Sequence, residues 1–171
     1  MRRRYIAPLI LGLNFLTAPA AHAQITVPMY KTSATGEQTT IGQVTLSDTE
    51  YGLLIEPQLT QLLPGLHGFH LHQHPNCDDH GMAAGGHFDP QQTGKHLGPY
   101  NAQGHLGDLP PLYTTCEGTA NVPTLAPRLH EADVKGLALM IHAGGDNFSD
   151  TPEPLGGGGE RIACGVIGDQ K

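Results

Sequence analysis

Residues 68–72 read GFHLH, and this short stretch decides the fold expected around it. Successive side chains of a β-strand point to opposite faces, so His70 and His72 share one face while Phe69 and Leu71 share the other. The apolar pair can enter a hydrophobic core while the two imidazoles lie side by side. The stretch therefore predicts a strand that builds a core and presents two metal-binding groups.

A glycine-rich segment follows this strand and carries further metal-binding residue types. Residues 85–108 contain six glycines and two prolines, and no apolar alternation extends beyond a few residues, so they predict a long loop. Loops of this length within a compact domain usually serve a function. This one contains His87, His96, His105 and Asp108, a spacing that predicts a bound ion ordering the loop.

The N-terminus has the composition of a secretion signal covering residues 1–23. Three arginines at positions 2–4 precede an apolar run at positions 6–16, and Ala21 to Ala23 form a cleavage site of the A-x-A kind. The mature chain is therefore expected to begin at Gln24. A membrane anchor is less favoured, because the apolar run is well short of about 20 residues.

The mature chain, residues 24–171, is expected to be one acidic domain. Removing the leader takes away three arginines and no acids, so the net charge moves from -7 to -10. Nucleic acids and anionic lipids are bound by clustered Lys and Arg, of which only six then remain. The sequence thus predicts no nucleic acid partner, and no membrane partner after signal cleavage.

The cysteines suggest a disulfide, because an exported chain enters an oxidising compartment. Cys77, Cys116 and Cys164 allow three pairings, and composition does not choose among them.

The rest of the chain reads as short strands separated by turns. A predicted hairpin turns at Glu117 and Gly118, residues 124–136 form a connection with one short helical turn, and residues 143–160 form a second long loop. With about eight strands and no long helix, the expected class is an all-β sandwich or barrel. The strands other than 68–72 are expected at residues 25–31, 41–47, 51–57, 112–116, 119–123, 137–142 and 161–167.

Six segments of the chain together resemble the signature segments of one family. GFHLH, GGHFDP, KHLGPYN, GHLGD, IHAGGDN and GGGGERIACGVI occur in the order and near spacing of bacterial periplasmic copper/zinc superoxide dismutases. The resemblance covers essentially the whole mature chain. It implies a Greek-key, eight-stranded flattened barrel with two long functional loops, located in the periplasm. It also implies an oxidoreductase that converts superoxide to dioxygen and hydrogen peroxide as copper cycles between Cu(II) and Cu(I).

Carried over position by position, the resemblance implies one copper and one structural zinc ion per chain. His87 would bridge the two ions and exchange a proton during catalysis. The implied copper ligands are His70, His72, His87 and His142, and the implied zinc ligands are His87, His96, His105 and Asp108.

The resemblance also assigns residues around the ligands. Asp146 matches a carboxylate that joins a copper ligand to a zinc ligand, and Arg161 matches a catalytic arginine that draws superoxide to copper. In an acidic protein, Arg161, the metals and Lys95 are expected to create the local attraction. The resemblance further favours a disulfide between Cys77 and Cys164, with Cys116 as a buried thiol in a strand.

Two alternative functions differ from the dismutase in the residues they require. A non-catalytic copper or zinc binding module would keep the ligands but could dispense with Arg161, whereas a zinc hydrolase needs an open zinc position that four protein ligands would not leave.

His67 shares the face of Phe69 and is expected to be a structural, hydrogen-bonded histidine. The segment between Cys77 and Gly85 is shorter than in many bacterial relatives, so both a monomer and a homodimer are possible.

Overall fold

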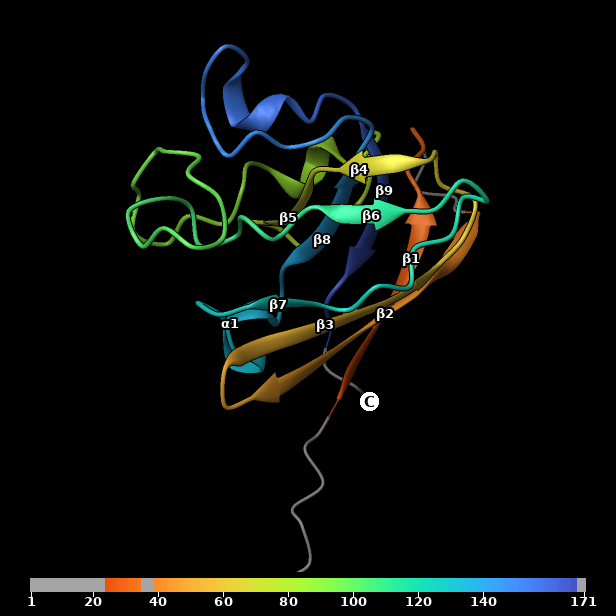
Figure 1. Cartoon of the computed structure of the whole chain (residues 1–171), viewed down its shortest axis with the longest axis horizontal. Helices are drawn as coiled ribbons and strands as arrows, with labels where there is room; N and C mark the ends of the chain where they lie inside the picture. Colours follow the sequence, from red (N-terminus) through yellow and green to blue (C-terminus); the bar gives the residue numbers. More distant parts are fainter. Residues whose placement is uncertain (1–23, 35–38, 169–171) are drawn as a thin grey trace, which may run out of the picture.

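The computed structural model describes residues 24–34 and 39–168, which form an all-β structure (Figure 1). The predicted fold class is confirmed, and no helix in the described part of the chain is long and apolar enough to span a membrane. The strands are β1 (Ile25–Lys31), β2 (Thr40–Thr49), β3 (Gly52–Leu59), β4 (Gly65–His67), β5 (Phe69–His72), β6 (Leu112–Thr114), β7 (Thr124–Ala126), β8 (Ala138–His142) and β9 (Arg161–Val166).

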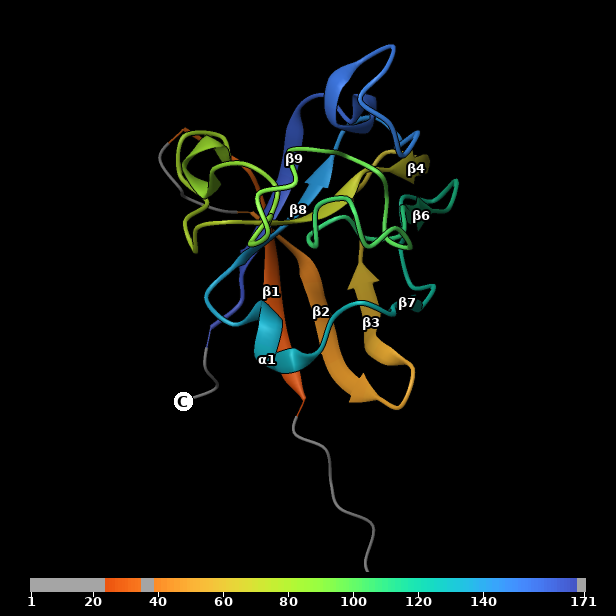
Figure 2. The ribbon, with the colours of Figure 1, turned by 90° about the vertical axis from the view of Figure 1, so that its left-hand side faces the viewer.

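Seven of these strands make one curved antiparallel sheet in the order β5-β8-β9-β1-β2-β3-β7. The remaining two, β4 and β6, pair with each other in a small second sheet. Figures 1 and 2 show this small sheet standing apart from β1, β2 and β3. The main sheet curls into a half-barrel, and the small sheet stands beside it.

The core follows the period-two pattern expected of strands. In β1, Ile25, Val27 and Met29 are buried while Pro28 is exposed, because alternate side chains face the interior. In β5 all four residues are buried, and Phe69 belongs to the hydrophobic core as predicted from GFHLH. The other face of β5 is covered by the metal-binding loop rather than by solvent.

Two strand predictions differ from the structure. The strand expected at residues 68–72 is part of a longer one that divides at Gly68, so that β4 pairs with β6 while β5 pairs with β8. The strand expected at 119–123 pairs only at Ala120, which exchanges both backbone hydrogen bonds with Leu59 of β3. The chain therefore crosses to β3 instead of returning beside β6, and the predicted hairpin is wrong.

The long loops gather at one end of the barrel. Residues 73–111 and 143–160 lie toward the top of Figure 2, whereas the β2–β3 hairpin lies at the bottom. The loops contain only two short 3-10 turns, η1 (Met82–Ala84) and η2 (Pro154–Gly157), and the connection after β7 holds the single helical turn α1 (Glu131–Val134). The predicted long loops and helical turn are confirmed, but residues 124–126, expected to belong to the connection, instead form β7 and pair with β3.

Candidate metal centre

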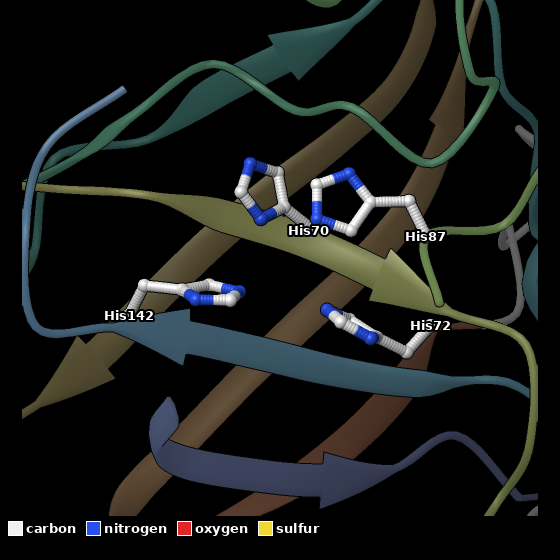
Figure 3. A group of neighbouring side chains, drawn as sticks. All are labelled: His70, His72, His87 and His142. Atoms are coloured by element: carbon white, nitrogen blue, oxygen red, sulfur yellow. The ribbon is translucent and has the colours of Figure 1, made fainter. Parts of the chain in front are cut away.

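Four histidines from two strands and one loop meet at the loop end of the main sheet (Figure 3). His70 and His72 project from the same face of β5, and His142 is the last residue of the neighbouring strand β8. His87 comes from the loop, whose backbone bridges to β5 at His72. One ligand atom from each of the four lies within 4.8 Å of the others. The rings predicted to share a site are therefore together.

Three of these rings are fixed by the nitrogen that points away from the cluster. Such outer contacts set the tautomer and the orientation of a histidine ligand. The contacts are His70 Nε2 to Asp146 Oδ2 at 2.8 Å, His72 Nδ1 to Gly85 O at 2.9 Å and His142 Nδ1 to Gly159 O at 3.1 Å.

The nitrogens that point into the clusters have no hydrogen-bond partner. An unpartnered buried polar atom is costly, so several such nitrogens aimed at one point are typical of a metal-binding site. In the described residues, six of the seven such side-chain atoms belong to imidazoles: His70 Nδ1, His72 Nε2, His87 Nε2, His96 Nδ1, His105 Nδ1 and His142 Nε2.

The first cluster favours neutral imidazoles, the form that binds a metal. Burial lowers the pKa of His70 to about 3, only partly offset by its hydrogen bond to Asp146. Burial likewise lowers the pKa of His72 to about 2 and that of His142 to about 4, and it lowers the pKa of His87. Their lone pairs are therefore available at neutral pH.

A second cluster shares His87 with the first and adds His96, His105 and Asp108. Asp108 Oδ1 lies 3.0 Å from His87 Nδ1, 3.0 Å from His96 Nδ1 and 3.5 Å from His105 Nδ1. Tetrahedral ligands about 2.0 Å from a zinc ion are separated by roughly 3.3 Å. The spacing and the donor types therefore fit zinc, and the two ring nitrogens of His87 face one cluster each.

The single carboxylate of the second cluster, Asp108, is ionised and changes the protonation of its neighbours. Burial favours the neutral form of Asp108, but contacts with three histidines outweigh it and hold the pKa of this carboxyl below its usual range. Burial also opposes protonation of His96, yet the contacts with Asp108 and Asp146 raise its pKa to about 9. A site that favours a proton so strongly also favours a metal cation.

Asp146 joins the two clusters through their outer nitrogens. One carboxylate oxygen lies 2.8 Å from His70 Nε2 and the other 2.8 Å from His96 Nε2. Gly156 runs so close to this pair that a Cβ atom there would collide with the Asp146 carboxylate and lie 2.8 Å from His96 Nε2. Asp146 therefore contacts one ring of each cluster.

A pocket of about 370 Å³ opens beside the first cluster, and its walls include His87, His142 and Arg161. Arg161 donates hydrogen bonds from its two terminal nitrogens to Gly81 O at 2.6 Å and Gly85 O at 2.7 Å. Its guanidinium is therefore held in one orientation and is the only cationic side chain lining this pocket in the described residues. Lys95, which was also expected to attract the anion, is exposed elsewhere and does not line it.

The disulfide between Cys77 and Cys164 is confirmed. It joins the loop that carries Gly81 and Gly85 to β9, the strand that begins at Arg161. The covalent link therefore holds the carbonyls that orient the arginine close to the strand that carries it.

Two further predictions concern single residues. His67 is buried and its ring nitrogens lie 2.8 Å from His142 O and 2.7 Å from Leu63 O, as expected of a structural histidine. Cys116, expected as a buried thiol in a strand, is instead exposed in the turn after β6. The prediction is wrong because β6 ends at Thr114, where the chain turns.

Comparisons with known proteins agree with this geometry. The profile of the copper/zinc superoxide dismutase family matches residues 40–167. The chain belongs to this family. The superoxide dismutase [Cu-Zn] of Legionella pneumophila is 53% identical over 159 residues, covering 93% of this chain and 96% of that protein. Superoxide dismutase [Cu-Zn] 1 of Salmonella typhimurium (strain LT2) is 50% identical over 171 residues, covering 95% and 97%.

Solved structures of copper/zinc superoxide dismutases have the same fold. The enzyme from Brucella abortus superimposes with a TM-score of 0.80 at 45% identity, covering 85% of this chain and 99% of that one. The solution structure of the monomeric enzyme from Salmonella enterica gives a TM-score of 0.75 at 52% identity, with 85% and 99% covered. The protein is therefore a superoxide dismutase, an oxidoreductase with copper and zinc sites.

Two residues that hold the centre were not found from the sequence. Asp150 accepts the backbone N–H of His96, and Arg128 donates to the carbonyls of Gly98, Gly104 and His105. Both act on backbone groups, which leave no pattern of residue types. Asp150 lies in a turn-like stretch and Arg128 in a connection, so neither stood out.

Proposed function

We propose that one copper and one zinc ion occupy the two clusters, with His87 bridging them. The unpartnered imidazole nitrogens aimed into the clusters carry this assignment. Imidazole suits copper, while three histidines and one aspartate make the closed donor set of structural zinc. The assigned copper ligands are His70, His72, His87 and His142, and the assigned zinc ligands are His87, His96, His105 and Asp108.

The assignment is tested by the metal content of purified protein. We expect one copper and one zinc per chain. His105→Ala removes a ligand of the second cluster alone and should lower zinc while copper stays. His72→Ala removes a ligand of the first cluster alone and should do the reverse. Equal loss of both metals in both variants would contradict two separate sites.

Bound copper supplies the one-electron redox change that superoxide dismutation requires. Arg161 binds the anionic substrate, because its guanidinium faces the pocket beside His142 and its orientation is fixed. His87 Nε2 is buried without a partner, and His87 lines the same pocket. We propose that this nitrogen, when it is not bound to copper, would hold a proton during turnover and give it to the departing peroxide.

We also propose that the chain is exported to the periplasm and that residues 1–23 are removed. These residues lie outside the part that the structure describes, so the proposal depends on their sequence pattern and on the disulfide between Cys77 and Cys164. Mass spectrometry of protein from the periplasmic fraction should give a chain that begins at Gln24. An uncleaved chain in the cytoplasmic fraction would contradict export.

The mature domain, residues 24–171, is proposed to act as a monomer or homodimer that binds neither nucleic acid nor membrane. Its acidic charge opposes both kinds of partner, and a relative from Salmonella enterica is described as monomeric. Sedimentation of the purified enzyme should give the mass of one or two chains. A larger assembly would contradict the proposal.

A further inference from the structure

The second long loop holds His96 at two separate points. Asp150 Oδ2 accepts the backbone N–H of His96 at 2.9 Å, and Asp146 Oδ1 lies 2.8 Å from the Nε2 atom of its ring. With its outer nitrogen and its backbone amide both engaged, the free Nδ1 atom can point only toward Asp108, 3.0 Å away. The backbone contact and the ring contact together fix the position of this ligand.

The Asp150 carboxylate has a second partner within its own loop. Its Oδ1 atom accepts the backbone N–H of Leu155 at 3.3 Å. Leu155, together with Glu153 and Pro154, lines the pocket beside the first cluster, which is called the copper pocket from here on. One carboxylate therefore contacts the backbone of a zinc ligand on one side and the rim of the copper pocket on the other.

Packing brings the two loops together at the same place. Gly98 in the first loop lies directly against the ring of Phe148, and a Cβ atom at Gly98 would be 2.6 Å from Phe148 Cγ. The backbone N–H of Phe148 donates to Asp146 Oδ1 at 2.8 Å. These contacts join the two loops. Among the residues that make them, Asp150 is the one that is exposed.

We propose that Asp150 is a positioning residue that ties the zinc ligand His96 to the rim of the copper pocket. The inference depends on the proposed zinc site. Asp150 offers its oxygens to two amides, so it acts on the metal through the backbone of His96 rather than as a ligand. Hydrogen bonds with a charged acceptor are stronger than neutral ones. Removing partners of metal ligands typically costs 10- to 100-fold in affinity.

The test measures zinc release from the metal-loaded mature protein into an excess of EDTA at neutral pH. Asp150→Ala removes both contacts and should release zinc about tenfold faster than wild type. Asp150→Asn keeps one carbonyl oxygen but turns an NH2 group toward the second amide, so its rate should fall between the two. Asp133→Asn is the matched control.

Asp133 is a suitable control because it is also an exposed aspartate that accepts one backbone N–H, from His130, and it lies on α1 and in neither loop. Its variant carries the same charge change and should release zinc at the wild-type rate. A second readout replaces zinc by cobalt and records the visible absorption bands, which report ligand geometry. Asp150→Ala should shift these bands, and Asp133→Asn should not.

The outcomes separate this inference from the assignment of the site. Zinc release and cobalt bands equal to wild type in both Asp150 variants would overturn the inference while leaving the zinc site in place. A purely structural role would lower the melting temperature yet leave the cobalt bands unchanged, which also overturns it. A wild-type chain that holds no zinc would overturn the proposed site, and this inference with it.

Discussion

At the scale of single residues, the ligand histidines differ in what holds their outer nitrogens. His72 and His142 face backbone carbonyls, whereas His70 and His96 share the carboxylate of Asp146. A carboxylate partner raises the basicity of an imidazole more than a neutral carbonyl does. His70 and His96, which Asp146 joins, should therefore bind their metals more strongly than they would with a backbone carbonyl as the outer partner.

Arg161→Ala should lower the rate of superoxide removal about tenfold or more, the scale of one lost contact with a charged group. Pulse radiolysis of the metal-loaded enzyme measures this rate. Arg161→Lys keeps the charge but cannot reach Gly81 O and Gly85 O with two nitrogens, so it should be intermediate. An alanine variant as fast as wild type would exclude the proposed role.

The depressed histidine pKa values predict how the metal-free protein responds to acid. His70, His72 and His142 have folded-state pKa values of about 3, 2 and 4, below the usual 6.5, so the unfolded chain binds more protons between these values. The free energy of unfolding should therefore fall as the pH drops from about 6.5 to 4. His96, whose pKa is raised, stays protonated in the folded state, so it slightly opposes this decline near pH 6.5 and has no effect below about pH 5.5, where both states are protonated.

Urea denaturation of the metal-free protein at a series of pH values measures this decline. A free energy of unfolding that stays constant between about pH 6.5 and 4 would contradict the low pKa values. Saturating the protein with zinc and copper should raise stability at neutral pH, because both ions bind the folded state, and the gain should shrink toward acid pH because protons compete for the ligands.

At the scale of elements, the disulfide links the loop after β5 to strand β9. Cys77 and Cys164 are 87 residues apart, and closing a loop of that length stabilises a fold by about 4 to 5 kcal/mol in the chain-entropy description. The paired change Cys77→Ser with Cys164→Ser should lower the free energy of unfolding by that amount in urea denaturation. Cys116→Ser, at an exposed free thiol, should change it by less than about 0.5 kcal/mol.

The elements that could be predicted are those with a local pattern. Alternation placed β1 and β5, and the run before His142 placed β8, because burial of one face or both is visible in residue types. Pairing partners were not visible, so the crossing of the chain at Ala120 to Leu59 was missed. The ligands were found because histidine is rare and specific, whereas Asp150 acts through backbone amides that every residue carries.

At the scale of the whole molecule, an acidic protein must attract an anion. The copper pocket is lined by one arginine but also by Glu153 and Glu160. Glutamates at the rim repel superoxide over distances within the Debye length, about 8 Å at physiological salt. The electrostatic field in the pocket is therefore the sum of the attraction by Arg161 and the metals and the repulsion by these two carboxylates.

Glu160→Gln should raise the second-order rate with superoxide by a factor of about two to three at low ionic strength, because it removes a repelling charge at the rim. Pulse radiolysis at increasing salt should show the difference shrinking. Glu50→Gln makes the same charge change in the turn between β2 and β3, at the opposite end (Figure 2), and should leave the rate unchanged. Equal acceleration in both variants would point to net charge instead.

The way β5 is covered has a consequence for misassembly. β5 is the outer strand of the main sheet, so one of its edges pairs with no other strand of that sheet. The backbone groups on this edge bond to the ligand-bearing loop instead: Leu71 N donates to Gly107 O, and Phe88 N donates to Leu71 O. A strand with unsatisfied backbone groups is a template for pairing with other copies of the chain. We therefore expect metal ions bound by this loop to help keep β5 capped, so that their loss should remove a safeguard against aggregation.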